Sequence, residues 1–426
     1  MERTETDRVY DITVVGATGF AGSLVAEYLF ERLEASQFTL ALAGRSMDRL
    51  ESLRDRLTAS DPDSATPPAP QLVHVNLLDQ NSVDALVHKT RVVVATAGPY
   101  SRYGSLLVAS CATYGTHYVD LSGETPWMQR MIRQHDQQAR ANGACIVHAC
   151  GYDSIPSDLG VLFLRDVMAS DDRGEPEAIR FVPGRTEGGF SGGTVASMLS
   201  MFADARKDAG TREALRDPDS LTPDQHSSQR SRRRRYDPWL REWTVPFVME
   251  AVNSRIVRRT NALTGYPLGT DPDYREVIRF GRGIAACIKS YAASFGMGLF
   301  LLLLLFPPTR FLLSRFILPK PGEGPKVARE GGGSFLVRLI GYSSSHGSSA
   351  PGAAPARTIG STTITVSADR DPGYGATAIM VAETAMLLCG QAETNSVSAG
   401  FQTPATAFGL PLVERLTSAG VKFVRG

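Results

Sequence analysis

The sequence predicts an α/β protein, with a Rossmann-type doubly wound parallel sheet in residues 1–150 and a second α+β domain in residues 151–426. Two observations support this fold class. Six apolar strand signals alternate with helical patterns in the first part of the chain, and the first signal runs into a glycine-rich turn that opens a helix. Strands that alternate with helices favour right-handed crossovers and a parallel sheet covered on both faces. The length of 426 residues also favours two domains over one.

The elements of the first domain follow from the periodicity of its apolar residues. Strands are expected at residues 9–15, 38–43, 71–75, 91–95, 116–119 and 144–149. Helices are expected at residues 20–33, 46–58, 79–88, 103–114 and 126–142. Residues 61–70 (DPDSATPPAP) break both periods and should form a surface loop.

After residue 150 the alternation becomes irregular, which marks the domain boundary. Strands are expected at residues 177–183 and 358–368, and helices at residues 193–209 and 372–389. Residues 217–235 are polar and end in SRRRR, so we expect a solvated loop, with a contact to phosphate or acidic lipid as the alternative. Residues 319–355 are rich in glycine, proline and serine and are expected to be flexible.

A long apolar segment, residues 292–318, does not match the length of a membrane-spanning helix. Its first part, Ala292 to Phe306, has 15 residues without a charge, whereas a spanning helix needs about 20. A buried helix, a helix half inserted in one leaflet and the wall of a tunnel for a fatty substrate remain open. Basic residues flank the segment and would suit anionic headgroups. They are Arg279, Arg282, Lys289, Arg310, Arg315 and Lys320.

The composition excludes several classes of protein. The net charge of +1 gives no overall attraction for nucleic acid, so no nucleic-acid partner is expected. The five cysteines never form a C-x-x-C pair, which argues against a zinc site and a disulfide framework, so no metal is expected. The polar N-terminal residues do not read as a secretory signal, and a cytoplasmic location is expected. The sequence leaves open whether the protein forms a homodimer.

The segment GATGFAG, which follows the first strand, carries the first functional motif. Gly16 allows the tight turn, Gly19 allows the backbone to approach a pyrophosphate, and Gly22 allows the helix to pack against the strand. Thr18 and Phe20 lie in the same turn, and the first N–H groups of the helix would bind the phosphates. A tight structural turn is the alternative to a dinucleotide site.

The end of the second strand indicates which dinucleotide binds. Sites for NAD carry Asp or Glu there, whereas this sequence reads AGRS and has no carboxylate before Asp48. Arg45 can receive a 2′-phosphate through charge-assisted hydrogen bonds, assisted by Ser46 and Arg49. The cofactor is therefore expected to be NADP(H).

Polar and small residues follow the later strands at the carboxyl edge of the sheet, where open α/β sheets bind ligands. Ala97 and Gly98 are expected to line the cofactor cleft, and Asp120 and Glu124 to contact the substrate, with helix capping as the alternative for polar residues at this edge. In the second domain, Ser191 and Gly193 open a helix and are candidates for presenting N–H groups to the substrate; a flexible loop is the alternative.

The last strand of the first domain runs into GYDSIPSD. Tyr152 in this segment is expected to lie in the substrate cleft. Ser154, Ser157 and Asp158 are expected to cap the helix that begins beside Pro156.

Segments in both halves of the chain resemble known proteins. VVGATGFAG, LAGRS, ATAGPYSRYG, YVDLSGE and CGYDSIPSDLG resemble the saccharopine dehydrogenase-like oxidoreductase family. SGGTVAS, NSRIVRRTNAL, LPKPGEGP and GFQTPATAFGLPLVERL are similar in particular to the bacterial trans-acting enoyl reductases. The resemblance covers most of the chain. It implies NADPH-dependent reduction of an enoyl double bond in a polyketide- or lipid-derived acyl chain.

The resemblance also implies a reaction site and partners. Reduction of an α,β-unsaturated thioester requires a group that stabilises charge on the carbonyl oxygen and an acid that protonates the α-carbon. Tyr152 is the first candidate for the catalytic donor and Tyr100 the second. The acyl chain would arrive on a carrier protein, and the association of animal relatives with lipid droplets favours a peripheral contact with a membrane or lipid surface.

Two other functions remain open at this stage. One is a saccharopine-type dehydrogenase that acts on an amino-acid adduct, although no clear cluster of arginines in the second domain matches an amino-dicarboxylate. The other is a non-catalytic NADP-binding protein that organises a lipid surface.

Overall fold

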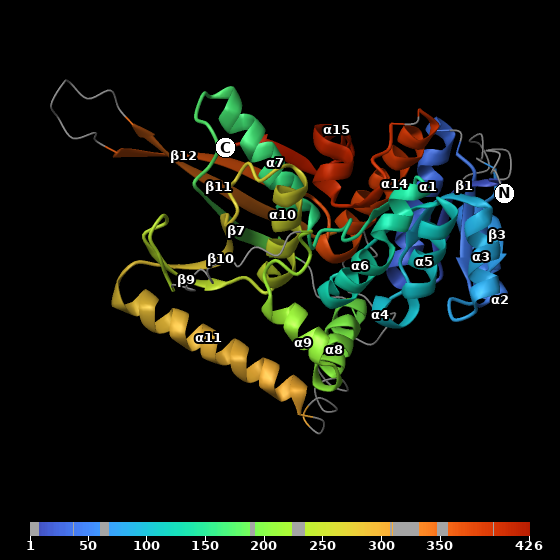
Figure 1. Cartoon of the computed structure of the whole chain (residues 1–426), viewed down its shortest axis with the longest axis horizontal. Coiled ribbons are helices and arrows are strands. Elements are labelled where there is room, and N and C mark those ends of the chain that lie inside the picture. The colour runs from blue at the N-terminus through green and yellow to red at the C-terminus, as the bar shows by residue number, and fades with distance from the viewer. Residues whose placement is uncertain are drawn as a thin grey trace.

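The computed structural model describes residues 8–36, 38–59, 68–187, 192–223, 235–306, 309, 332–346, 357–394 and 396–426. Two seven-stranded sheets organise these residues. Figure 1 shows the first sheet and its helices on the side of the N-terminus, and the second sheet with its long strands on the other side. The predicted fold class, a Rossmann-type sheet followed by an α+β part, is confirmed.

The first sheet is parallel throughout, with the strand order β13-β6-β5-β4-β1-β2-β3. Its strands are β1 (Tyr10–Val15), β2 (Leu40–Gly44), β3 (Gln71–His74), β4 (Thr90–Ala95), β5 (His117–Asp120), β6 (Cys145–Val147) and β13 (Gly400–Gln402). From β1 the chain first adds β2 and β3 on one side and then β4, β5 and β6 on the other side. The order of the strands therefore reverses between β1 and β4. In open α/β sheets this switch point is where ligands bind at the carboxyl edge.

Helices cover both faces of the first sheet. They are α1 (Phe20–Ser36), α2 (Met47–Thr58), α3 (Gln80–His88), α4 (Tyr100–Tyr103), α5 (Ser105–Tyr114), α6 (Thr125–Ala141) and α14 (Thr377–Glu393). Val92 and Val94 of β4 pack in one apolar cluster with Val25 of α1, whereas Val93 packs in another with Leu107 of α5. A strand that is buried on both faces needs such a continuous apolar run.

The second sheet is mixed, with the strand order β14-β12-β11-β7-β10-β9-β8. Its strands are β7 (Ala178–Glu187), β8 (Tyr236–Asp237), β9 (Glu242–Pro246), β10 (Asp273–Gly281), β11 (Ser334–His346), β12 (Arg357–Ala368) and β14 (Lys422–Arg425). Strand β7 is parallel to β10, and the other described pairs are antiparallel. Helices α7 (Ile155–Ser170), α10 (Glu250–Leu263) and α15 (Pro404–Ser418) pack on its strands.

Strand β11 corrects one expectation from the sequence. It forms a 13-residue strand inside the segment 319–355, which the composition predicted to be flexible. Val337 and Leu339 are buried while Arg338 between them is exposed, so the strand has the period of two that a half-buried sheet requires. Residues 319–331 and 347–355 of that segment, and residues 224–234 of the predicted polar loop, lie outside the described residues.

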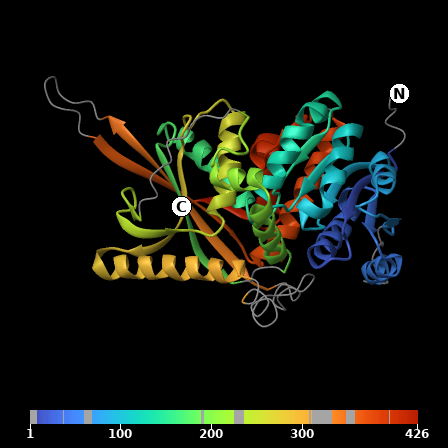
Figure 2. The same cartoon turned by 60° about the horizontal axis from the view of Figure 1, so that its bottom comes forward.

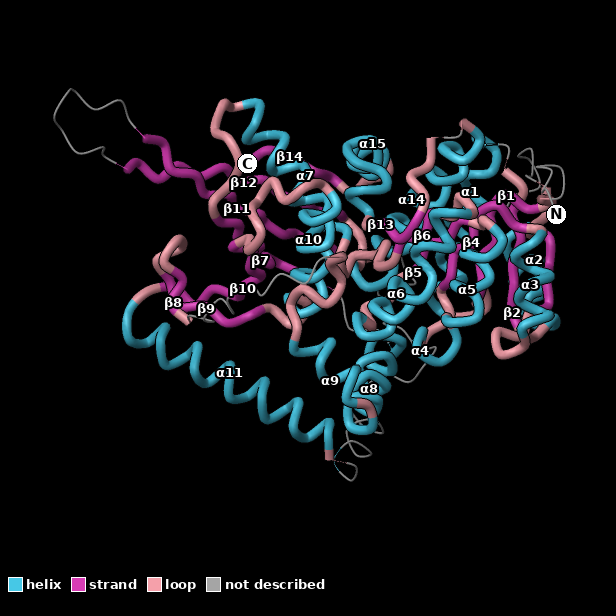
Figure 3. Tube along the Cα trace, in the orientation of Figure 1, coloured by secondary structure: helices cyan, strands magenta, loops and turns pink. Residues whose placement is uncertain are grey.

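The C-terminal part of the chain contributes to both sheets. Strand β13 pairs with β6 at the edge of the first sheet, as Figure 3 shows, and β14 pairs with β12 in the second. Helix α14 packs on α1 and on β4 of the first sheet. The sequence predicts that all residues after 150 belong to the second domain, because a three-residue strand and an almost completely buried helix carry no periodic signal of the sheet they join.

Helix α11 (Gly283–Leu305) is longer than the apolar run predicted for this segment. By length and composition, two helical segments of the described residues could cross a membrane, Gly283–Phe300 and Pro372–Glu393. The second is 78% buried in the protein, whereas only 11% of the first is buried. The expectation of a buried helix therefore does not hold for α11, and residues 310–318 lie outside the described residues.

Candidate active site

The turn after β1 requires glycine at two positions. Gly16 has a φ of +85°, and a Cβ atom there would lie 3.0 Å from the Cβ of Ala97. A Cβ atom on Gly22 would lie 2.2 Å from the carbonyl oxygen of Gly16, so a larger residue would push α1 away from the turn. Gly19 is exposed at the turn. Because the first N–H groups of α1 have no intrahelical acceptors, this turn fits a pyrophosphate.

The other two predicted residues of the turn connect it to its surroundings. The Oγ1 atom of Thr18 lies 3.8 Å from the position of a Cβ on Gly44, at the end of β2. The ring of Phe20 packs edge-on against Tyr374 at a centroid distance of 4.4 Å. Tyr374 belongs to a π-helical turn, η2 (Pro372–Ala376), that leads into α14. The glycine-rich turn thus contacts both β2 and the C-terminal part of the chain.

Arg45 directly follows β2 and is exposed. It forms no hydrogen bond or ion pair within the part of the chain that the structure describes. Ser46 is the N-cap of α2, where its Oγ accepts a hydrogen bond of 3.4 Å from the N–H of Arg49. A cation beside a helix N-terminus is unfavourable without an anion, so the position of Arg45 fits the 2′-phosphate of NADP(H).

The loop after β4 lies between the glycine-rich turn and the second half of the chain. Ala97 borders Gly16, and a Cβ atom on the exposed Gly98 would lie 3.6 Å from the Oγ of Ser197. Ser197 belongs to α8 (Gly192–Lys207), whose first turn contains Gly193. The structure therefore brings α8 to the carboxyl edge of the first sheet. Ser191 lies outside the described residues.

Glu124 connects the first sheet to α8. Its carboxylate is buried and accepts hydrogen bonds from the N–H groups of Tyr100 (2.7 Å) and Ser101 (2.9 Å). It also accepts a hydrogen bond of 2.8 Å from the hydroxyl of Ser197. The residue predicted to contact the substrate thus holds the first turn of α4 and positions α8.

The phenol of Tyr100, like the carboxylate of Glu124, is engaged in hydrogen bonds within the protein. Its hydroxyl donates to the carbonyl oxygen of Ala95 (2.9 Å) and accepts from the N–H of Leu121 (3.2 Å), so it joins the ends of β4 and β5. Burial raises the pKa of Tyr100 well above its ordinary value. The side chain is 5% exposed, which limits its contact with any substrate.

Asp120 organises the ends of β5 and β6. One carboxylate oxygen accepts hydrogen bonds from the N–H groups of Ser122 and Ala149, each at 3.0 Å. The other lies 2.7 Å from Nδ1 of His148 and accepts from the hydroxyl of Tyr118 at 3.0 Å. Asp120 is completely buried, so the structure gives it a positioning role for the segment that follows β6.

That segment carries Tyr152 and Asp153. The ring of Tyr152 packs edge-on against Phe335 of β11 at a centroid distance of 4.7 Å, and its N–H donates to Oγ1 of Thr377 at 3.1 Å. Tyr152 therefore lies where the two sheets and α14 meet. Burial is the main cause that raises the pKa of Tyr152 above its ordinary value.

Asp153 was not singled out from the sequence, although it follows the predicted Tyr152 directly. Burial raises the pKa of Asp153 to about 6. Its carboxyl group has no hydrogen-bond partner among the described residues. It is therefore a weak acid beside a phenol, at the carboxyl edge of β6.

Ser154 is the N-cap residue of α7, as predicted, but none of the three predicted side chains makes a capping hydrogen bond. Ser154 makes no side-chain capping bond and instead donates to Oδ1 of Asn253 at 2.9 Å. Ser157 donates to Glu276 at 2.6 Å, and Asp158 accepts from the N–H of Ala405 at 2.8 Å. These side chains face α10, β10 and α15, so their partners lie about a hundred residues or more away in the chain.

Two buried arginines also went unnoticed in the sequence. Arg259, in the segment NSRIVRRTNAL, donates to the carbonyl oxygens of Leu221 and Phe401 and so ties α10 to β13. Burial lowers the pKa of Arg259 to about 10. Arg180 of β7 lies between Asp237 (2.5 Å) and Asp273 (2.9 Å). Arg180 lies within the predicted strand at residues 177–183, between the buried Ile179 and Phe181, but the apolar run gave no sign that the arginine itself is buried.

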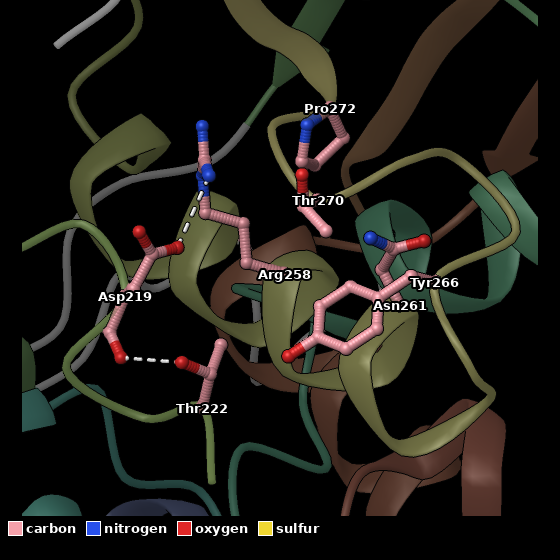
Figure 4. Close-up of a pocket in the computed structure, with 7 residues that line it drawn as sticks. All are labelled: Asp219, Thr222, Arg258, Asn261, Tyr266, Thr270 and Pro272. Atoms are coloured by element: carbon pink, nitrogen blue, oxygen red, sulfur yellow. Dashed lines mark hydrogen bonds and ion pairs between the residues drawn. The ribbon is translucent and has the colours of Figure 1, made fainter. Parts of the chain in front are cut away.

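A small polar pocket lies beside α10, and Figure 4 shows its lining residues. They are Asp219, Thr222, Arg258, Asn261, Tyr266, Thr270 and Pro272. Arg258 is already paired with Asp219 at 3.1 Å and with Asp271 at 2.8 Å. Since no residue of the glycine-rich turn or of the segment around Tyr152 lines it, this pocket is separate from the candidate active site.

One group of potential metal ligands occurs among the described residues, formed by Asp11, Cys389 and Glu393. The guanidinium of Arg91 lies 3.1 Å from Asp11 and 2.7 Å from Glu393. Both carboxylates therefore already have a cationic partner, and the cluster joins the start of the first sheet to α14.

The comparisons with known proteins agree with this geometry. Residues 12–147 match the family model of the saccharopine dehydrogenase NADP-binding domain. The chain is 38% identical over 435 residues to a provisionally named trans-acting enoyl reductase of Mycobacterium tuberculosis (strain H37Rv), with 98% of each chain covered. It is 34% identical over 433 residues to the trans-acting enoyl reductase of Mycobacterium ulcerans (strain Agy99), again with 98% of each covered.

A solved structure shows the same fold. Saccharopine dehydrogenase (L-Glu forming) from Saccharomyces cerevisiae superposes with a TM-score of 0.52 at 12% identity, covering 98% of this chain and 100% of that one. The glycine-rich turn and the unpaired Arg45 supply the residues that an NADP(H) site needs. The chain therefore belongs to the saccharopine dehydrogenase-like oxidoreductases, together with the trans-acting enoyl reductases, and is an NADP-dependent oxidoreductase.

Proposed function

We propose that the protein reduces the carbon–carbon double bond of an α,β-unsaturated thioester whose acyl chain is of polyketide or lipid origin and is delivered on a carrier protein. The names of the relatives support the reaction type. The observation that carries the proposal is the pair Tyr152 and Asp153 beside the cofactor edge of the sheet, because both groups are held towards their protonated forms.

The cofactor and the chain have separate tasks in this reaction. When bound, NADPH supplies a hydride to the β-carbon of the enoyl group. Tyr152 carries its proton at neutral pH, as a tyrosine ordinarily does, and burial raises its pKa further, so its hydroxyl is available as a donor to the thioester oxygen on which charge develops. Tyr100 is a weaker candidate for this role, since its hydroxyl already donates to Ala95.

Asp153 is the proposed acid for the α-carbon. A carboxyl group with a pKa of about 6 retains a protonated fraction near neutral pH, whereas an ordinary aspartate does not. The neighbouring Glu124 and Asp120 are fully engaged in hydrogen bonds within the protein. They are expected to act on the reaction through the residues that they position.

The experiment uses the full chain with NADPH and a trans-2-enoyl thioester, and follows the loss of NADPH absorbance. Tyr152→Phe is expected to lower kcat by about 10- to 100-fold, the typical effect of one oxyanion donor or general acid, while the Kd for NADPH stays unchanged. Tyr236→Phe, at an exposed tyrosine in β8, is the matched control. Turnover with aminoadipate semialdehyde and glutamate but not with the enoyl thioester would refute the proposal, as would tight NADPH binding without turnover of either.

The role of Asp153 is tested by the pH dependence of turnover. Because a general acid must be protonated, kcat is expected to fall as the pH rises above about 6. Asp153→Asn should lower kcat and remove this decline. A decline of the same shape in the variant would exclude Asp153 as the proton donor.

A further inference from the structure

Helix α11 carries a continuous apolar stripe that faces solvent. Its members follow one another at intervals of three or four residues, which places them on one side of a helix. They are Ile284, Ile288, Tyr291, Phe295, Leu299, Leu302 and, just after the helix, Phe306, and they are between 44% and 81% exposed. Most surface helices have their polar side towards solvent, so this orientation requires a partner.

The protein covers only part of the first half of α11. Ala286 and Ser290 are buried, and the helix packs on β9 and β10. Arg235 lies over the ring of Tyr291 at 4.0 Å. Figures 1 and 2 show the helix along an outer side of the second sheet, with no described element on its outward side.

The second half of α11 is apolar around its whole circumference. Gly296, Met297, Gly298 and Leu299 are consecutive residues, so they point in all directions around the axis, and all four are exposed. A second copy of the helix would cover one stripe and leave the other sides in water. Hydrocarbon would cover every side, and this difference favours lipid over a homodimer.

The charges of α11 point to the composition of the lipid. The helix contains no acidic residue. Arg282 at its N-cap and Lys289 in its second turn are exposed, and neither forms an ion pair within the described ranges. Both lie at the end that the protein holds, so they are positioned to meet anionic headgroups while the second half enters the acyl region.

We propose that α11 docks the protein on the surface of an anionic phospholipid bilayer, with Arg282 and Lys289 at the headgroups and residues 295–305 among the acyl chains of one leaflet. The 23 residues of α11 are about 34 Å long, but the charge-free part of the helix, from Ser290 to Leu305, accounts for only about 24 Å of the roughly 30 Å hydrocarbon core. This favours insertion in one leaflet. The proposal does not depend on the reaction that the enzyme catalyses.

Flotation of the full chain with vesicles tests the proposal. Vesicles of phosphatidylcholine with about one third phosphatidylglycerol are compared with pure phosphatidylcholine, and the wild type is expected to float with the anionic vesicles. Leu302→Asp should lower the partition coefficient by about tenfold or more, because it places a charge among acyl chains. Leu78→Asp is the matched control, since Leu78 is 61% exposed and Leu302 62%, and Leu78 lies far away beside α3.

A second pair of measurements separates the contributions. Lys289→Gln should reduce flotation with anionic vesicles by several-fold and leave the weaker binding to neutral vesicles unchanged. The Kd for NADPH, measured for every variant, shows that the fold is intact. Equal flotation of wild type and Leu302→Asp would overturn the proposal. It would also be overturned if the wild type failed to float and sedimented as a dimer that Leu302→Asp dissociates.

Discussion

Two neighbouring residues at the end of β2 differ in role: Ser46 caps α2, whereas Arg45 offers an exposed positive charge. Ser46 satisfies the backbone at the start of α2, so its hydroxyl is already engaged in the free protein. Arg45 has no partner in the described part of the chain and lies at the positive end of the helix dipole. A bound phosphate would relieve this repulsion, so we predict that Arg45 distinguishes NADPH from NADH.

Arg45→Ala is therefore expected to weaken NADPH binding by about 10- to 100-fold, the value of one or two charge-assisted hydrogen bonds, without changing the Kd for NADH. Isothermal titration with each dinucleotide measures the effect. Arg54→Ala is the control, because Arg54 lies on α2, the helix that follows Arg45, and pairs with Asp55. If the preference for NADPH survives in Arg45→Ala, the assignment of the 2′-phosphate to this residue is wrong.

Gly22 provides a steric test of the same site. In Gly22→Ala the new methyl group would meet the carbonyl oxygen of Gly16 at 2.2 Å, so the turn or α1 must move. We expect a loss of binding to both dinucleotides and a melting temperature lower by several degrees. Gly390→Ala in α14 meets nothing within 4 Å and should be neutral or slightly stabilising. Normal binding in Gly22→Ala would show that the turn tolerates a side chain.

The residues of the glycine-rich turn could be identified from the sequence, because their roles depend on residues close to them in the chain. Gly16 and Gly22 are required by local backbone geometry, and the prediction for Arg45 rests on its position at the end of one strand. The roles of Asp120 and Ser154 depend on partners at positions 148 and 253, and no local pattern reveals these partners. A single sequence identifies such residues as polar and well placed, but it does not show whether they face a substrate or the protein.

At the scale of elements, α7 connects the candidate active site to the second sheet through a buried carboxylate. Glu276 of β10 accepts hydrogen bonds from Ser157 (2.6 Å), Tyr274 (2.6 Å) and Asn253 (3.1 Å). Burial raises the pKa of Glu276 from 4.5 to about 7, more than these hydrogen bonds lower it. The folded protein therefore keeps a proton that the unfolded chain releases.

This shift determines how stability depends on pH. Since the folded state binds more protons between about pH 4.5 and pH 7, the contribution of Glu276 to stability falls as the pH rises through that range. Glu276→Gln removes the fall, so the melting temperature of the variant relative to the wild type should rise from pH 5 to pH 8. Glu414→Gln, at an exposed position of α15, is the control. Parallel pH curves for wild type and Glu276→Gln would contradict this assignment.

The elements that the sequence predicted are those with a clear period. Strands β1, β2 and β4 and helices α2 and α3 carry either continuous apolar runs or an amphipathic stripe. Helix α11 was recognised as apolar, but its exposure could not be predicted, because a buried helix and a lipid-facing helix have the same composition. Strand β11 was missed because glycine- and serine-rich stretches surround its alternating core.

At the scale of the whole molecule, the two sheets share one apolar core. A single cluster contains Val14 of β1, Leu159 of α7, Val337 of β11 and Leu412 of α15. The chain also returns to the first sheet through α14 and β13 before it ends in the second sheet with β14. Neither sheet can unfold without exposing apolar surface on elements that the other sheet holds.

The two sheets are therefore expected to unfold in one cooperative transition. Trp127 reports on the first sheet from α6, whereas Trp239 and Trp243 report on the second. Thermal unfolding of Trp239→Phe/Trp243→Phe, followed by Trp127 fluorescence and by far-UV circular dichroism of the same sample, should give coincident midpoints. NADPH should raise both midpoints equally, although the candidate cofactor residues belong to the first sheet. Two midpoints several degrees apart, with NADPH moving only the fluorescence midpoint, would mean that the sheets are independent domains despite their common core.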